Sequence, residues 1–316
     1  MSGAPQRPAA SGLRQALADY LAVRRSLGFK LARDEKLLAQ FLTCLEDHGV
    51  TTITVEHAMA RVTLPQGAGR SWLRMRLPVV RGFARWLRFP DPAAQVPPSG
   101  LLPPKPHRAV PYLYSSDDLT ALINAAEGLR TPLRALTYQT LIGLLAVSGL
   151  RIGEAIRLDL GDFDARRGVL TVTGSKFGKS RRIPLHPATT AALRNYLHHR
   201  GRHPQVSTKA VFVSTAGTRL LYVNVSVTFV KLAARAGLKA RSAKCHPRIH
   251  DLRHSFTVNT LLDWYRDGGD VQARLPLLPA YLGHVDPKST YWYLQAAPEL
   301  PALAGQRLDD HLEGRP

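Results

Sequence analysis

Near the end of the chain, the stretch HVDPKSTYWYL (residues 284–294) places two tyrosines behind a histidine. A tyrosine phenol can attack phosphorus and form a phosphotyrosyl ester, which keeps the energy of the broken linkage for its later re-formation. Because a phosphodiester repels nucleophiles, a metal-free enzyme of this kind needs fixed cationic donors. Arginine suits this purpose, since its planar fork donates two parallel hydrogen bonds and stays charged at any working pH.

Three further stretches contain side chains of the required types. They are SGLRIGEAIRLDLGDFD (residues 148–164), GSKFGKSRRIPL (residues 174–185) and HDLRH (residues 250–254). An arginine or lysine in any one of them would ordinarily be a surface or ion-pair residue, and only the whole set favours chemistry on a phosphate. No GxxxxGK[ST] motif occurs, so nothing indicates ATP, and the expected chemistry needs no metal or other cofactor.

The composition favours a polyanionic partner. The 316 residues include 43 lysines and arginines against 23 acidic residues, which gives a formal charge of +20, and double-stranded DNA fits this charge. A hydrophobic content of 45% is enough for globular cores. The two cysteines lie far apart, no apolar stretch approaches the ~20 residues of a membrane span, and the start does not resemble a signal peptide. We therefore expect a bacterial cytoplasmic protein on the nucleoid.

Clustered prolines divide the chain into two expected domains. We predict an N-terminal helical DNA-binding domain over residues 1–95, a proline-rich linker over 96–111 and a C-terminal domain over 112–316. Apolar residues recur at helical spacing in three runs of the first domain. These runs are Leu13, Leu17, Tyr20, Leu21; Leu37, Leu38, Phe41, Leu42, Leu45; and Trp72, Met75, Val79, Phe83, Trp86.

A second stripe in the last run is cationic. It consists of Arg70, Arg74, Arg81, Arg85 and Arg88. Taken alone it is as well explained by a solvated basic face, but in a DNA-binding protein we expect the stripe to face phosphates or a major groove. Pro78 is expected to kink this helix.

The second domain is expected to be mainly helical with a small sheet. A hairpin is predicted over residues 168–185, because β-type residues flank a turn that contains glycine and lysine. A helix from Asp117 begins at Ser115 or Ser116, and another ends at Ser148-Gly149. The predicted helices are 117–126, 132–147, 187–198, 223–236, 249–264 and 271–282.

Together the four stretches resemble the tyrosine recombinase, or phage integrase, family. They follow one another in the family's order, and the resemblance covers most of the second domain. The resemblance implies an α+β catalytic domain behind a helical core-binding domain. It also implies a catalytic set of Arg151, Lys176, His250, Arg253, His284 and Tyr293, with Glu154 and Asp162 in support. Tyr293 lies at the family's spacing behind His284, but STYWYL departs from the usual Thr-x-x-Tyr ending, so Tyr291 stays the alternative nucleophile.

The chemistry agrees with these roles. Arg151 and Arg253 would stabilise the transition-state charge, and one such donor is worth about 3 to 4 kcal/mol. His250 would take the phenol proton, Lys176 would protonate the departing 5′ oxygen, and His284 would donate to a phosphate oxygen. Lys179 is the rival of Lys176, and with Arg181 it is otherwise an expected DNA contact.

A zinc site is the competing interpretation of one stretch. Cys245, His246, His250 and His254 include histidines one helical turn apart. Pro247 keeps His246 off the helix and no second ligand pair has zinc spacing, so we expect no metal.

The resemblance also implies a homotetramer on two DNA sites, strand exchange through a four-way (Holliday) junction, and possible accessory proteins. With no separate arm-binding domain expected before Ser11, it favours the Xer-like or transposon-encoded recombinases, with integration, excision or dimer resolution as the role. The tail 295–316 is expected to pack on a neighbouring protomer through Leu294, Leu300, Leu303 and Leu308. A type IB topoisomerase, a telomere resolvase and a non-catalytic DNA-binding regulator remain alternatives.

Overall fold

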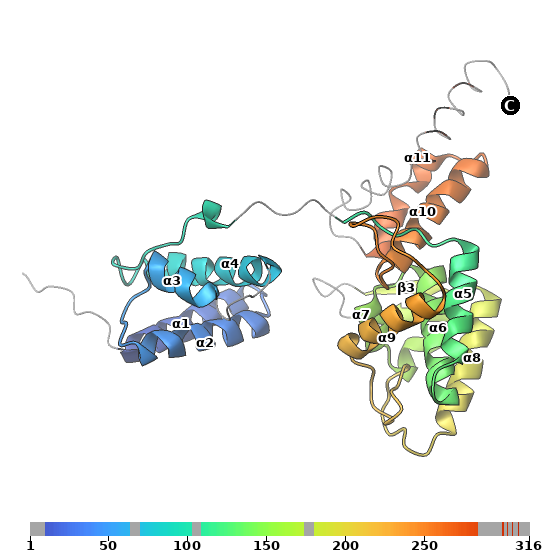
Figure 1. Cartoon of the computed structure of the whole chain (residues 1–316), viewed down its shortest axis with the longest axis horizontal. Coiled ribbons are helices and arrows are strands. Elements are labelled where there is room, and N and C mark those ends of the chain that lie inside the picture. Colours follow the sequence, from blue (N-terminus) through green and yellow to red (C-terminus); the bar gives the residue numbers. More distant parts are fainter. Residues whose placement is uncertain are drawn as a thin grey trace, which may run out of the picture. The chain divides into compact units, whose positions relative to one another are not determined.

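The computed structural model describes residues 10–63, 70–102, 109–173 and 180–283, together with residues 299, 302, 305 and 309. The chain divides into two compact units, Met1–His107 and Arg108–Pro316 (Figure 1). We call them the N-terminal and C-terminal units. The dividing point lies within the proline-rich stretch, and each unit has a hydrophobic core of its own.

The N-terminal unit is helical. Its helices are α1 (Ala10–Ser26), α2 (Ala32–Asp47), α3 (Val55–Val62) and α4 (Arg70–Leu87). The three runs predicted from the sequence lie on α1, α2 and α4, whereas α3 was not predicted. Only Ala58 and Val62 of this short helix are buried, so its apolar period is weak. Its start is nevertheless defined, because the Thr54 side chain accepts a hydrogen bond from the His57 backbone N–H at 3.2 Å.

Helix α4 buries a face that overlaps the predicted run, since Phe83 is buried and Val79 and Trp86 pack against the core. Its buried residues are Arg76, Leu77, Val80, Phe83, Ala84 and Leu87. Trp72, which we expected in the core, is 38% exposed. The Arg76 guanidinium lies over its ring, with Cζ 4.7 Å from the ring centroid. The predicted run therefore holds over the second half of the helix, and Leu77, Val80, Ala84 and Leu87 complete the buried face. The helix continues through Pro78.

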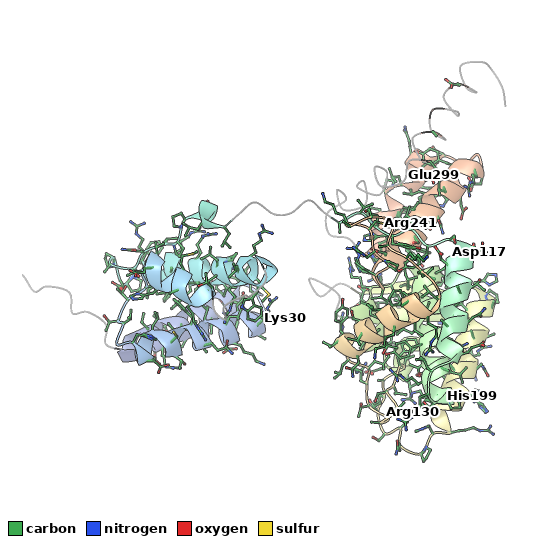
Figure 2. The ribbon with its side chains drawn as sticks, viewed as in Figure 1. Lys30, Asp117, Arg130, His199, Arg241 and Glu299 are labelled. Carbon is green, nitrogen blue, oxygen red and sulfur yellow. The ribbon has the colours of Figure 1, made fainter. Side chains whose placement is uncertain are left out.

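The C-terminal unit is built around α6 (Pro132–Ser148), which packs against α5 (Ser116–Glu127), α8 (Pro187–Gly201) and α10 (Asp251–Arg266) (Figure 1). Helix α5 begins at a capping box formed by Ser115 and Asp118, with Asp117 in its first turn (Figure 2). The remaining helices of this unit in the described ranges are α7 (Ile152–Arg157), α9 (Tyr222–Arg235), α11 (Val271–Arg274) and α12 (Leu277–Leu282).

A three-stranded antiparallel sheet has the order β1-β2-β3, with β1 (Phe163–Asp164), β2 (Val169–Val172) and β3 (Arg181–Pro184). Leu170 pairs with Ile183, and both are buried. Strands β2 and β3 coincide with the two arms of the predicted hairpin, whereas β1 was not expected. The predicted fold class, mainly helical with a small sheet, is confirmed.

One helix prediction is wrong. We expected a single helix over residues 271–282, but α11 ends at Arg274 and α12 begins at Leu277. Pro276 explains the break, because it has no backbone N–H to continue the helical ladder. In the ranges described, no helix combines the length and apolar character that a membrane span requires.

Candidate active site

Arg151 lies at the N-terminus of α7, directly after the turn that ends α6. Gly149 makes this turn with a φ of +59°, and a Cβ there would lie 2.4 Å from Phe256 Cδ1, so glycine is required on two grounds. The backbone N–H of Arg151 donates to Glu154 Oε2 at 2.9 Å, and its Nη1 donates to Glu154 Oε1 at 2.9 Å. Local hydrogen bonds thus fix the direction of the Arg151 side chain.

Arg253 is buried on α10, with 2% of its surface exposed. Its Nη1 donates to the Gly149 carbonyl at 2.6 Å, and its Nη2 donates to the Leu282 carbonyl at 2.7 Å. Arg151 Nη1 reaches the same Leu282 carbonyl at 3.5 Å, while its Nη2 donates to the Gly283 carbonyl at 3.1 Å. The two arginines predicted from the sequence therefore converge on one backbone oxygen at the end of α12.

Glu154 joins Arg151 to a third arginine. Its carboxylate, 3% exposed, accepts from Arg181 Nη1 at 3.1 Å and from Arg181 Nη2 at 2.8 Å. Burial alone would raise the pKa of Glu154, but the hydrogen bonds from Arg181 and Arg151 outweigh it and lower that pKa to about 2. Glu154 is thus a carboxylate at any working pH, and Arg181, which we expected to contact DNA, binds it with both terminal nitrogens.

His250 lies immediately before α10. Its ring meets His254 edge-on, with centroids 5.0 Å apart. The loss of water around the ring lowers the pKa of His250, and the positive charge of Arg253 lowers it further. The imidazole is therefore neutral at pH 7, as a general base must be.

The start of α10 is held by a buried carboxylate. Asp251 is fully buried and accepts from Arg248 Nε at 2.9 Å and from Arg248 Nη2 at 2.8 Å. The Tyr114 hydroxyl donates to the Arg248 carbonyl at 3.0 Å, and Ser255 Oγ accepts from the Tyr114 N–H at 2.8 Å. These contacts fix the segment that carries His250 and Arg253, and the sequence patterns did not reveal them.

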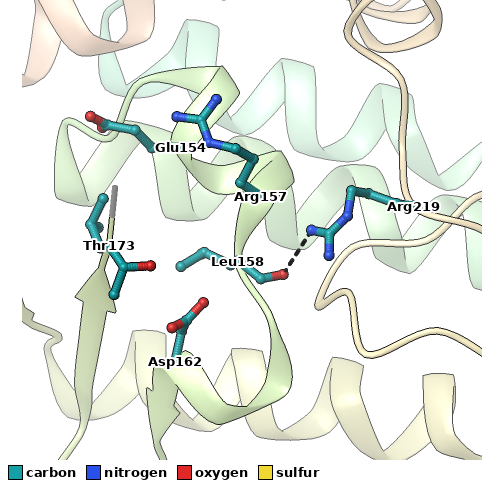
Figure 3. Close-up of a pocket in the computed structure, with 7 residues that line it drawn as sticks. Glu154, Arg157, Leu158, Asp162, Thr173 and Arg219 are labelled. Atoms are coloured by element: carbon teal, nitrogen blue, oxygen red, sulfur yellow. Dashed lines mark hydrogen bonds between the residues drawn. The ribbon is translucent and has the colours of Figure 1, made fainter. Parts of the chain in front are cut away.

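Asp162 lies at a neighbouring cavity of about 380 Å³, lined by Glu154, Arg157, Leu158, Asp162, Val172, Thr173 and Arg219 (Figure 3). Asp162 Oδ2 accepts from the Asp159 N–H at 2.9 Å, and Arg219 closes the other side by donating to the Leu158 carbonyl at 3.3 Å. Asp162 thereby caps its own turn, and its supporting catalytic role stays a prediction.

Several predicted residues lie outside the described ranges. They are Lys176, Lys179, His284, Tyr291 and Tyr293. In the sequence, Lys176 and Lys179 lie between β2 and β3, and His284 follows Gly283, whose carbonyl accepts from Arg151. Their neighbours in the chain thus belong to the arginine and glutamate cluster.

The cationic stripe of α4 is only partly available. Arg85 and Arg88 are exposed and Arg74 is partly buried, while the Arg70 side chain lies outside the described set. Arg81 donates from Nε to the Pro97 carbonyl at 2.6 Å and from Nη2 to the Pro98 carbonyl. Arg81 therefore holds the beginning of the proline-rich stretch against α4.

The zinc alternative finds no support in the part of the chain that is described. No group of three or more histidine, cysteine, aspartate or glutamate side chains there is arranged to hold a metal ion. Cys245 Sγ donates to the Pro111 carbonyl at 3.6 Å, and His246 Nε2 lies 3.0 Å from the Ala243 carbonyl.

Comparisons with known proteins show which family the chain is similar to. The sequence profile of the phage integrase family matches residues 113–299. A putative integrase/recombinase of Sinorhizobium fredii, y4rB, is 45% identical over 96% of this chain and 99% of its own length. The tyrosine recombinase XerC of Pseudomonas syringae is 33% identical over 86% of this chain and 83% of its own length.

Two solved structures show the same fold. The Tn1549 transposon integrase in complex with transposon right end DNA gives a TM-score of 0.61 at 15% identity, covering 94% of this chain and 99% of that one. The XerH site-specific recombinase bound to palindromic difH substrate gives a TM-score of 0.59 at 17% identity, covering 96% of this chain and 84% of that one. On its sequence relatives and its family match, the chain belongs to the phage integrase family, the tyrosine recombinases, which are enzymes that cut and rejoin DNA.

Proposed function

We propose that this chain recombines DNA at a specific site, cutting and rejoining each strand through a 3′-phosphotyrosyl link to Tyr293. One observation carries the proposal: Arg151 and Arg253 both donate to the Leu282 carbonyl, at 3.5 and 2.7 Å. Two guanidinium groups that share one oxygen can also share one phosphate. In this interpretation the carbonyls of Gly149, Leu282 and Gly283 hold the two guanidinium groups side by side, where both can donate to one phosphate.

The proposed step is a transesterification. The Tyr293 oxygen attacks phosphorus, a P–O bond to tyrosine forms, and the P–O5′ bond of the DNA breaks. His250 takes the phenol proton, and Lys176 gives a proton to the departing 5′ oxygen. Arg151, Arg253 and His284 donate to the non-bridging oxygens, where negative charge accumulates. Attack by a 5′ hydroxyl on the phosphotyrosyl ester reverses the step and rejoins the DNA.

DNA binding and assembly extend the proposal. Exposed Arg85 and Arg88, with Arg74 and Arg70, would contact phosphates from the N-terminal unit. A lambda integrase tetramer has been solved bound to a Holliday junction. We infer the same stoichiometry for this chain, on two sites, with the tail from residue 295 packed on a neighbouring protomer and with accessory proteins where the site requires them.

We further propose that the chain works in the bacterial cytoplasm, on the nucleoid. Its relative y4rB is named a putative integrase/recombinase, and the Tn1549 transposon integrase has been solved in complex with transposon right end DNA. Integration or excision of a mobile element is therefore the role we favour over dimer resolution.

Covalent trapping tests the proposal. Nicked duplexes drawn from the DNA that flanks the gene would be incubated with wild type, Tyr293→Phe and Tyr291→Phe without metal ions, then denatured. We expect an adduct that only Tyr293→Phe abolishes. Relaxation of a plasmid that lacks any recombination site would favour the topoisomerase alternative, and tight binding without an adduct would favour the regulator.

A further inference from the structure

Arg181, the first residue of β3, is held away from solvent. Its side chain is 11% exposed, and both of its terminal nitrogens donate to Glu154. Arg182, the next residue of the strand, is exposed. Of these two adjacent arginines, Arg182 is therefore available to DNA, while Arg181 is committed to a contact inside the C-terminal unit.

The Glu154 carboxylate is shared between Arg181 and Arg151. Oε1 accepts from Arg181 Nη1 at 3.1 Å and from Arg151 Nη1 at 2.9 Å. Oε2 accepts from Arg181 Nη2 at 2.8 Å and from the Arg151 backbone N–H at 2.9 Å. Each carboxylate oxygen thus binds one group of each arginine residue, so the position of Arg181 bears directly on that of Arg151.

Gly283 closes the arrangement from the other side. It has a φ of +67°, and a Cβ there would lie 2.9 Å from Arg181 Nη1 and 3.2 Å from its Cζ. The Gly283 carbonyl accepts from Arg151 Nη2 at 3.1 Å. The absence of a side chain at Gly283 lets the Arg181 guanidinium lie against the segment whose carbonyls Arg151 and Arg253 bind.

The charges of Arg151, Glu154 and Arg181 determine how Arg151 is oriented. A buried carboxylate with a single arginine partner would draw that guanidinium into a bidentate pair and away from a substrate phosphate. Arg181 already supplies a bidentate pair, so Arg151 uses only Nη1 and its backbone N–H on Glu154, and Nη2 points to Gly283. The orientation of Arg151 toward the Leu282 and Gly283 carbonyls follows.

We propose that Arg181 is a positioning residue for Arg151, acting through Glu154, and not a DNA contact. The proposal rests on the proposed function, since it assigns Arg151 to the transition-state phosphate. Among the residues that the structure describes, substitution of Arg181 leaves Glu154 with Arg151 as its arginine partner, which turns the Arg151 guanidinium onto the carboxylate. Stabilisation of the transition-state charge is thereby weakened, whereas DNA affinity and departure of the 5′ oxygen are not.

The test uses the full chain and three forms of a duplex on which the wild type forms an adduct. One has an ordinary phosphodiester at the cleavage position. The second has a methylphosphonate, which is neutral and therefore depends less on Arg151. The third has a 5′-bridging phosphorothiolate, whose sulfur departs without a proton donor. The variants are Arg181→Gln, Arg181→Lys and the matched control Arg182→Gln, which removes the same charge from the next residue.

We expect Arg181→Gln to slow adduct formation on the ordinary duplex roughly a hundredfold, the effect of misplacing one preorganised donor. The methylphosphonate should reduce that deficit to within about tenfold, while the phosphorothiolate leaves it unchanged. Arg181→Lys, which keeps the charge but loses the planar fork, should be intermediate. Arg182→Gln should weaken DNA binding, and the rates on the three duplexes should keep their wild-type ratio.

Three results would overturn the proposal. An equal deficit on all three duplexes would indicate a general loss of structure. Rescue by the phosphorothiolate alone would mean that Arg181 acts on the leaving group. A deficit confined to DNA affinity would make Arg181 a DNA contact after all.

A second measurement separates this proposal from the proposed function. If the wild type forms no adduct on any duplex, the proposed function fails, and Glu154 can still be followed by carboxyl NMR with selectively labelled glutamate. Arg181→Gln should then raise the pKa of Glu154 and shift the guanidinium resonances of Arg151. Unchanged signals would refute the coupling of Arg181 to Arg151.

Discussion

Removal of the Glu154 charge should be among the most damaging conservative changes in the C-terminal unit. Glu154→Gln keeps the shape of the side chain but leaves Arg151 and Arg181 facing a neutral amide. The pKa of Glu154 falls from an ordinary 4.5 to about 2 in the folded chain, which corresponds to about 3 kcal/mol of stabilisation of the ionised form. Loss of one partner from a buried ion pair costs a similar amount, about 3 to 5 kcal/mol.

The pH dependence follows from the sign of that shift. Because the folded pKa is depressed, the stabilisation is fully present above pH 4.5 and is lost as the pH falls through about 2. The difference between wild type and Glu154→Gln in the free energy of unfolding should therefore be about 3 kcal/mol at pH 7 and fall to about 1 to 1.5 kcal/mol at pH 3.

Urea denaturation followed by circular dichroism, on the transition of the C-terminal unit, measures these differences. Glu127→Gln, at the exposed end of α5, is the matched control and should change stability by no more than about 0.5 kcal/mol. A loss below about 1 kcal/mol for Glu154→Gln at pH 7, or a loss that does not shrink at pH 3, would refute this account of the cluster.

Three further predictions concern the same site. Arg253→Ala should slow adduct formation by a hundredfold or more, about 3 kcal/mol in the transition state, in a trapping assay at saturating DNA; a tenfold effect or less would place Arg253 outside the reaction. Because the pKa of His250 is lowered, the acid limb of the rate of adduct formation should lie below pH 6.5 in the wild type and disappear in His250→Gln; an unchanged limb would exclude His250 as the base. Gly149→Ala should destabilise the C-terminal unit by about 2 kcal/mol or more in urea, through its positive φ and its contact with Phe256, whereas Gly143→Ala on α6, with open space around it, should be neutral or stabilising.

Much of the fold could be predicted where local chemistry decides it. Helix α6 begins behind a Thr131 cap with Pro132 in its first turn, and it ends at Gly149 in the left-handed conformation. The hairpin has β-type residues on both arms. The break between α11 and α12 was missed, although Pro276 was visible in the sequence, because the apolar spacing on both sides fits one helix.

The site could be predicted only in part. Arg151, His250 and Arg253 were predicted from the family resemblance, and the structure brings the two arginines together on the Leu282 carbonyl. Their supporting contacts join distant positions, and neither periodicity nor charge distinguishes buried Arg181 from exposed Arg182 on the same strand. Only the folded structure shows that Arg181, and not Arg182, binds Glu154.

The most direct test of the central claim is to identify the residue that becomes attached to DNA. Wild-type protein trapped on a nicked duplex would be digested with protease and nuclease, and the nucleotide-bearing peptide sequenced by mass spectrometry. We expect a 3′-phosphotyrosyl link at Tyr293, formed a hundredfold or more slowly in Arg253→Ala. A link at any other residue, or full adduct formation without Arg253, would contradict it.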